Sequence, residues 1–278
     1  MGRRPLGASI RFIRTGLCAG VALLVLGTTA QGAVVLQDTY YGGIDTYNNP
    51  NDLIGPASVF DIVSAVIDRV GSGGNTLQVT INTNFAGKPG TADADGTGYG
   101  ALFLTPGVNA WHPTGTAPNY PEDTYQPGEW QYAFTIPQVP NSSSGTGGLY
   151  LTSAGTIQLS NVFNDTVTYP FPGNNGYYFR QNQAVQFTPN YPNSPVANGT
   201  WTVGLSQLVF DITDNHLLGD NFALSWAITC ANDVIQGQVS GVPEPATWVM
   251  MIFGFGMIGV SMRRRKNAVG STALGAMA

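Results

Sequence analysis

The sequence contains little charge, two cysteines and two histidines. Only 10% of its 278 residues are charged, whereas hydrophobic residues make up 43%. A histidine-based hydrolytic triad or a zinc site requires several histidine or cysteine side chains to converge on one point. His112 and His216 are far apart in the sequence, and both stand in segments typical of loops. We therefore interpret both histidines as turn residues and expect neither kind of site.

Positive charge is nearly absent from the middle of the chain. Between Thr15 and Met262 the basic residues are Arg69, Lys88 and Arg180, against all 16 acidic residues, which gives a formal charge of −13. A nucleic-acid-binding protein needs a cationic face to displace counterions from phosphates. The composition therefore excludes nucleic acid as a partner. The remaining eight cations form two groups, one before the first apolar run and one after the last.

Residues 1–33 have the pattern of a secretory signal peptide. Four arginines precede Leu17–Ala30, an apolar run of 14 residues, and small residues follow it. This order predicts export by the Sec translocon and removal of the segment by signal peptidase. The alternative is an uncleaved anchor helix, but the run is shorter than the ~20 residues that a helix needs to span a bilayer. Cleavage removes Cys18 and leaves Cys230 alone, so the exported domain depends on its hydrophobic core rather than on an intrachain disulfide.

Residues 34–240 are predicted to form one all-β domain. Gly and Pro interrupt this region so often that no stretch of 12 residues keeps helical spacing. Leu77–Asn84 alternates apolar and polar residues, which is the period of a half-buried strand, and about ten such stretches occur along the region. Many short strands separated by turn residues favour a single two-sheet β-sandwich of jelly-roll type. We expect Pro113–Pro127 and Pro137–Gly147 to be surface loops.

The Gly-rich segment Thr91–Gly100 contains two aspartates that are candidate calcium ligands. Asp93 and Asp95 stand two residues apart, and carboxylates at alternating positions of a tight loop are typical of Ca²⁺ coordination. The rest of the segment does not complete an EF-hand loop, and Asp-Gly is also ordinary turn chemistry. A turn without metal is therefore the alternative. A second acidic set could join this loop in three dimensions: Asp38, Asp45 and Asp52.

Glutamate is scarce between the two groups of cations, where the glutamates are Glu122, Glu129 and, within the tail, Glu244. A glycosidase needs an acid and a base or nucleophile at a defined separation, and Glu129, beside Trp130, is the candidate for such a role. Exposed aromatic side chains would suit sugar stacking, but aromatic residues in a β domain mostly fill the core. We expect a non-catalytic domain without a cofactor. The alternatives are a carbohydrate-active enzyme and a lectin-like carbohydrate-binding module.

The segment after the β region has the features of a short transmembrane helix. Ala246–Met262 is an uncharged run of 17 residues, about 25 Å long as a helix, which just crosses a bilayer core. Trp248 stands at its outer end, and the four cations after the run favour the cytoplasmic side, so residues 267–278 are predicted to be a cytoplasmic tail. Pro243 and Pro245 keep the chain extended just outside the membrane, where a membrane-embedded peptidase can reach it.

Residues 241–266 resemble the PEP-CTERM protein-sorting tail of Gram-negative bacteria, which is also called an ice-binding protein C-terminal motif without implying ice binding. The residues that carry the resemblance are Val242, Pro243, Glu244, Pro245, Trp248, Gly254, Gly256, Gly259, Arg263, Arg264 and Arg265. The resemblance implies recognition by an exosortase, a membrane cysteine transpeptidase-like enzyme, and cleavage near the Pro-Glu-Pro motif. It also implies export through the inner membrane, transient anchoring there, and delivery to the cell surface or to an extracellular matrix that contains exopolysaccharide.

Overall fold

The computed structural model describes residues 33–45, 52–91, 97–160 and 180–242, together with Phe255, Gly256 and Ile258. Residues 1–32 of the predicted signal peptide and most of the predicted membrane span lie outside these ranges. Within the described ranges, no helix is long and apolar enough to cross a membrane. The β region, by contrast, is described over most of its length.

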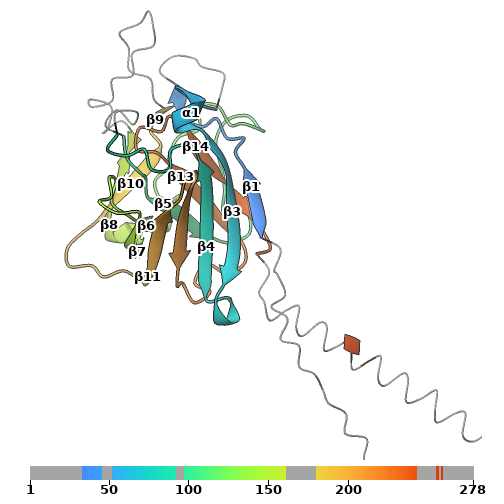
Figure 1. Cartoon of the computed structure of the whole chain (residues 1–278). Helices are drawn as coiled ribbons and strands as arrows, with labels where there is room; N and C mark the ends of the chain where they lie inside the picture. Colours follow the sequence, from blue (N-terminus) through green and yellow to red (C-terminus); the bar gives the residue numbers. More distant parts are fainter. Residues whose placement is uncertain are drawn as a thin grey trace, which may run out of the picture. The chain divides into compact units, whose positions relative to one another are not determined.

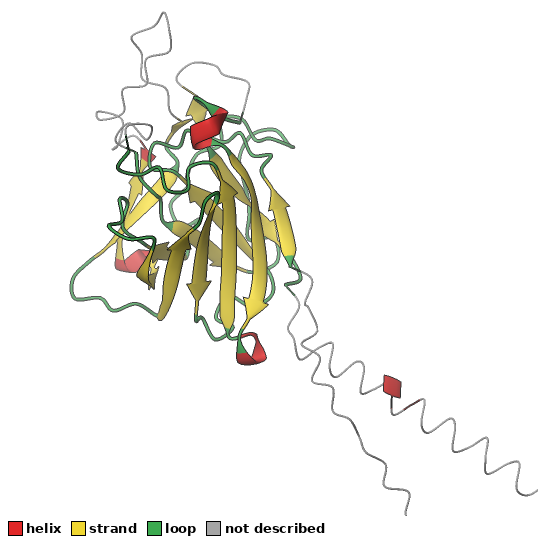
Figure 2. Ribbon diagram, viewed as in Figure 1, coloured by secondary structure: helices red, strands yellow, loops and turns green. Residues whose placement is uncertain are grey.

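The described residues form a β domain with a few single-turn helices (Figure 2), which confirms the prediction of an all-β fold. The strands are β1 (Val34–Gln37), β2 (Ile44–Asp45), β3 (Ile62–Val70), β4 (Thr76–Thr83), β5 (Leu102–Pro106), β6 (Tyr132–Thr135), β7 (Ser144–Leu151), β8 (Gly155–Leu159), β9 (Arg180–Gln181), β10 (Ala184–Pro189), β11 (Ala197–Val203), β12 (Gln207–Ile212), β13 (Phe222–Ala227) and β14 (Val234–Val239). The helices are α1 (Ala57–Phe60) and the 3₁₀ turns η1 (Ser72–Gly74) and η3 (Thr152–Ala154).

Ten of these strands form one antiparallel sheet in the order β1-β3-β4-β12-β11-β7-β6-β5-β13-β14 (Figure 1). The sheet curls so far that its two edge strands contact each other. A Cβ atom added to Gly237 on β14 would lie only 2.9 Å from Leu36 Cδ1 on β1. The predicted division into two packed sheets is not confirmed, because hydrogen bonding continues from one edge strand to the other. Alternation in a sequence predicts a strand, but it does not predict the strand's partners.

The concave side of the sheet encloses the main hydrophobic core, and the alternation of the sequence decides which residues enter it. Leu77, Val79 and Ile81 on β4 are fully buried, as are the three residues opposite them on β12. Burying such an aliphatic side chain contributes about 1.5–3 kcal/mol. Cys230 is fully buried in the same cluster.

A second layer covers the outer face of one part of the sheet. The two-stranded sheet of β8 and β10, together with the segment 107–131, packs there through Trp130, Phe187 and Trp111 against side chains of β5, β6 and β13. As a result all six residues of β13 are buried. The segment 107–131 is thus partly packed rather than a free surface loop, because it carries the aromatic side chains that fill this layer.

Candidate functional site

The folded domain continues to the residue that directly precedes the Pro-Glu-Pro motif. The Val242 side chain is fully buried in the main core cluster, and its N–H donates to the Asp220 carbonyl at 3.0 Å. The N–H of Gly241 donates to Asn221 Oδ1 at 3.1 Å. Pro243 is the next residue. The domain therefore holds the start of the sorting segment without an intervening linker.

Most of the other residues predicted to form the sorting signal lie outside the described ranges. Gly256 is described, is helical and is exposed. The residues outside are Pro243, Glu244, Pro245, Trp248, Gly254, Gly259, Arg263, Arg264 and Arg265. The calcium candidates Asp93 and Asp95 also lie outside, so the structure places neither of them.

Two aspartates meet where the edge strands of the sheet approach each other. Asp38 directly follows β1, Asp233 directly precedes β14, and the two carboxyls lie within hydrogen-bonding reach of each other. Each Asp38 oxygen has less than 1 Å² of exposed surface and receives no hydrogen bond of normal geometry. Asp233 is more fully satisfied, because its Oδ2 accepts from the Ile62 N–H at 2.6 Å and its Oδ1 from the Val234 N–H at 3.0 Å.

The acidic cluster is defined as Asp38, Asp52, Asp61 and Asp233, and burial favours the neutral form of three of its carboxyls, those of Asp38, Asp61 and Asp233. Burial raises the pKa of Asp38 well above its usual range, and the negative charges of Asp233 and Asp52 raise it further. Burial likewise raises the pKa of Asp233, against the opposing effects of the Ile62 N–H and the Arg180 guanidinium. The pKa of Asp61 is raised by burial and by Asp52.

The sequence pointed to part of this cluster. Asp38 and Asp52 belong to the second acidic set, whereas Asp61 and Asp233 were missed and the side chain of Asp45 lies outside the described residues. One feature of the sequence indicates Asp233, because this residue directly precedes an apolar strand. A carboxylate buried at such a position requires a partner. Among the described residues no set of three His, Cys, Asp or Glu side chains is arranged to hold a metal ion.

Glu129 belongs to the segment 107–131 and contacts β14. Its Oε1 accepts a hydrogen bond from Gln236 Nε2 and its Oε2 accepts one from the Gln126 N–H, both at 3.1 Å. Burial raises the pKa of Glu129 to about 7, with the Gln126 N–H opposing the shift and the charge of Asp123 adding to it. Asp123 itself is buried and accepts from the Tyr40 hydroxyl at 2.6 Å and from Thr114 at 2.7 Å.

We predict that Glu129 makes the folded state less stable as pH rises. Its pKa is about 7 in the folded protein against 4.5 ordinarily, so the folded protein holds a proton that the unfolded chain releases. This contribution is fully present below about pH 4.5 and is lost as pH rises through about 7, at a cost of up to about 3 kcal/mol. Urea unfolding at pH 4.5, 6 and 8 should therefore show a shallower decline for Glu129→Gln than for wild type. Glu122→Gln, at an exposed position, is the control. If the free energy of unfolding of Glu129→Gln falls with pH as steeply as that of wild type, the raised pKa of Glu129 is contradicted.

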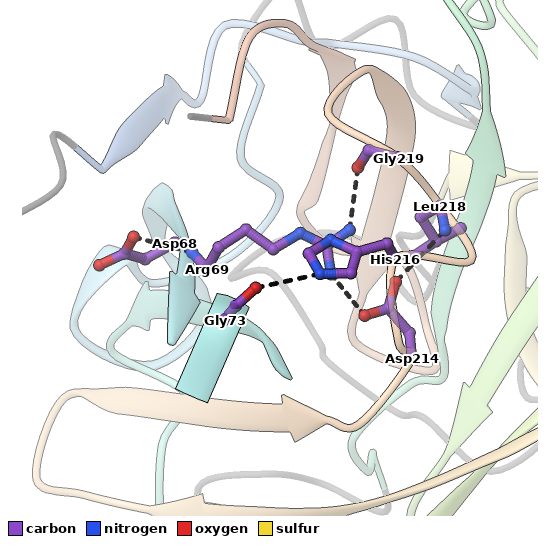
Figure 3. Close-up of polar contacts among 7 residues, drawn as sticks. All are labelled: Asp68, Arg69, Gly73, Asp214, His216, Leu218 and Gly219. Carbon is purple, nitrogen blue, oxygen red and sulfur yellow. Dashed lines mark hydrogen bonds and ion pairs between the residues drawn. The ribbon is translucent and has the colours of Figure 1, made fainter. Parts of the chain in front are cut away.

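Neither histidine belongs to a cluster of catalytic type among the described residues. His112 is exposed, whereas His216 is half-buried with its Nε2 at 3.1 Å from the Gly73 carbonyl oxygen. Figure 3 shows that His216 lies beside the fully buried ion pair of Arg69 and Asp214. Together His216, Arg69 and Asp214 connect the end of β3 and the turn after it to the loop that follows β12. We therefore interpret the role of His216 as structural.

An open groove of about 620 Å³ crosses the outer face of β6, β7 and β11. Gly148 forms its floor, because Thr135 and Asn198 are its partners on the neighbouring strands. A Cβ atom at Gly148 would lie 2.8 Å from Tyr150 Cε2 and 3.0 Å from Pro195 Cβ, so only glycine keeps this hollow open. The full lining is Thr135, Ile136, Pro137, Thr146, Gly147, Gly148, Tyr150, Pro195, Asn198 and Gly199, which includes no charged side chain.

Comparison with known protein families identifies the tail. Residues 241–266 match the PEP-CTERM protein-sorting motif. Comparison with the curated proteins and with the solved structures gives no match. The match begins at Gly241, one residue before the fully buried Val242. The chain thus carries a PEP-CTERM protein-sorting motif directly at the edge of its β domain, and this motif supports an exported protein that an exosortase targets.

Proposed function

We propose that this protein is an exosortase-sorted protein of the cell surface or extracellular matrix whose β domain binds exopolysaccharide without cleaving it. The Sec translocon exports it through the inner membrane and signal peptidase removes the leader. The tail then anchors the protein transiently until the exosortase removes it. The observation that carries this proposal is the sorting motif at residues 241–266.

The junction at Val242 supports a tail that can be removed. Every described residue of the hydrophobic core lies at or before Val242. Cleavage within Pro243–Pro245 therefore leaves these core residues and the Val242 hydrogen bond in place. Because cleavage there removes no described core residue, we expect the domain to keep most of its stability. The exosortase can then release a domain that stays folded.

The surroundings of Glu129 support a non-catalytic domain. A paired-carboxylate mechanism requires a second carboxylate that is free to act as base or nucleophile. The nearby carboxylate is Asp123, which is 2% exposed and whose two oxygens already accept hydrogen bonds from Tyr40 and Thr114. Although the raised pKa would suit Glu129 as a general acid, the complementary group is already engaged in structural contacts.

The groove across β6, β7 and β11 supports binding of a neutral polysaccharide. Its lining offers a half-buried aromatic ring at Tyr150 and side-chain hydrogen-bonding groups at Thr135 and Asn198. The Tyr150 ring packs against Phe187, with 6.2 Å between ring centroids, and this contact holds it in place as a wall of the groove. A fixed aromatic face with nearby hydroxyl and amide groups suits a sugar ring, and the uncharged lining favours a neutral one over an acidic one.

We expect the purified protein to bind the producing strain's neutral exopolysaccharide and to leave its chain length unchanged. Tyr150→Ala should weaken binding at least about tenfold, which is the loss of about 1.4 kcal/mol of contact energy. Tyr191→Ala is the matched control, because Tyr191 is 99% exposed and lies outside the groove. Equal binding by Tyr150→Ala and wild type would refute the groove. Shortening of the polysaccharide that Glu129→Gln abolishes would show a carbohydrate-active enzyme instead.

A further inference from the structure

The acidic cluster carries more negative charge than the described residues around it balance. Among the described residues, the cation that acts on the cluster is Arg180, which is itself buried and lowers the pKa of Asp233. The Arg180 guanidinium donates to the main-chain carbonyls of Tyr41 and Asp52. With all four carboxyls ionised, the cluster and Arg180 together have an excess of three negative charges. Uncompensated charge of this kind is costly inside a protein.

The Asp38 carboxylate is the part of the cluster that points to a ligand. Both of its oxygens are buried and receive no hydrogen bond of normal geometry, while the Tyr40 N–H and the Asp233 carboxyl lie near the Asp38 carboxyl. Buried polar groups nearly always have a partner, so two orphaned oxygens on one side chain require an explanation. Each oxygen of Asp233 accepts only one backbone N–H, which leaves a lone pair on each for a further contact.

We propose that Asp38 and Asp233 bind a divalent cation, Ca²⁺, between the two edge strands of the main sheet. Ca²⁺ accepts six to eight oxygen ligands in flexible geometry, and two carboxylates supplemented by main-chain carbonyls and water meet this need. Mg²⁺ is less suitable, because it demands near-ideal octahedral geometry and keeps most of its water. Asp52 and Asp61 add negative charge around the ion without having to coordinate it.

The position of this site gives the ion a structural role. Asp38 directly follows β1 and Asp233 directly precedes β14, and these strands are the two edges that the curled sheet brings together. An ion bound to both aspartates joins the two edges at one end. Because the ion binds the folded state and not the unfolded chain, it raises the unfolding temperature. This role is independent of the sorting tail and of the polysaccharide groove.

The test is thermal unfolding of the full-length protein in mild detergent at pH 7.5, after treatment with EDTA and dialysis. Calcium chloride at about one hundred times its dissociation constant should raise Tm by about 5–10 °C, whereas magnesium chloride at equal ionic strength should raise it far less. Asp38→Asn and Asp233→Asn should each abolish the calcium shift. The double variant Asp93→Asn with Asp95→Asn is the matched control and should retain it.

If the Asp38 and Asp233 variants fail to fold, titration of the wild-type protein with Ca²⁺ still tests the proposal. Isothermal titration should give saturable Ca²⁺ binding that the Asp93 and Asp95 double variant preserves in full. No calcium shift and no binding heat in wild type would overturn the proposal and mean that protons alone neutralise the cluster. Loss of the shift in the Asp93 and Asp95 double variant would overturn it as well, since the ion would then belong to that loop.

Discussion

Replacing Pro243 and Glu244 with alanine is expected to leave the protein unprocessed and in the membrane fraction. The two prolines of the motif each fix their own φ angle and restrict the residue before them, so the peptide stays extended where a peptidase can bind it. Removing one proline and the acidic side chain leaves the apolar run and the basic cluster unchanged. The precursor should therefore still enter the membrane, and nearly all of it should remain there.

The chain contains a matched control for this experiment. Pro121-Glu122 is the same dipeptide in an exposed loop of the β domain. Pro121→Ala with Glu122→Ala should be processed like wild type. Immunoblots of membrane, surface and medium fractions report both variants in the same strain. Normal processing of the Pro243 and Glu244 variant would show that the tail is not read through this motif.

Replacing Arg69 with methionine is expected to destabilise the domain by about 3–5 kcal/mol, because it leaves the buried Asp214 carboxylate without its partner. Both side chains of this ion pair are fully buried. Arg69 also donates to the Gly219 carbonyl at 2.9 Å, and Asp214 Oδ2 accepts from the Leu218 N–H at 3.3 Å. The loop after β12 thus depends on a guanidinium that β3 supplies, as Figure 3 shows.

Urea unfolding measures this loss, and a double variant identifies its cause. Arg69→Met together with Asp214→Leu should recover most of the stability, because no buried charge then remains without a partner. A loss below about 1 kcal/mol in Arg69→Met would mean that the pair behaves like a surface salt bridge. Failure of the double variant to recover would assign the loss to packing instead.

The strands were largely predictable from the sequence, and their arrangement was not. Leu77, Val79 and Ile81 alternate with polar residues, and the structure buries all three. Their partners on β12 stand more than a hundred residues later in the chain, because Val79 pairs with Phe210. Local periodicity contains no information about that pairing, and for this reason a two-sheet arrangement and one curled sheet have the same sequence pattern.

The candidate sites also differ in how far they can be predicted from the sequence. The sorting tail was recognisable because its Pro-Glu-Pro motif, apolar run and basic cluster are consecutive in the sequence. The pairs Asp38 with Asp233 and Arg69 with Asp214 depend on contacts between distant segments, so no local sequence pattern indicates either of them. The burial of Val242 was also missed, because a single valine between glycine and proline has no periodic context.

We propose that the exosortase removes the tail, and the intact mass of the protein recovered from the cell surface or medium tests this claim. We predict a polypeptide that has lost its leader and ends within Pro243–Pro245, with Val242 retained in the core. A mature protein whose mass includes the apolar run and the residues after it, through Ala278, would contradict the claim and show that the tail is a permanent anchor.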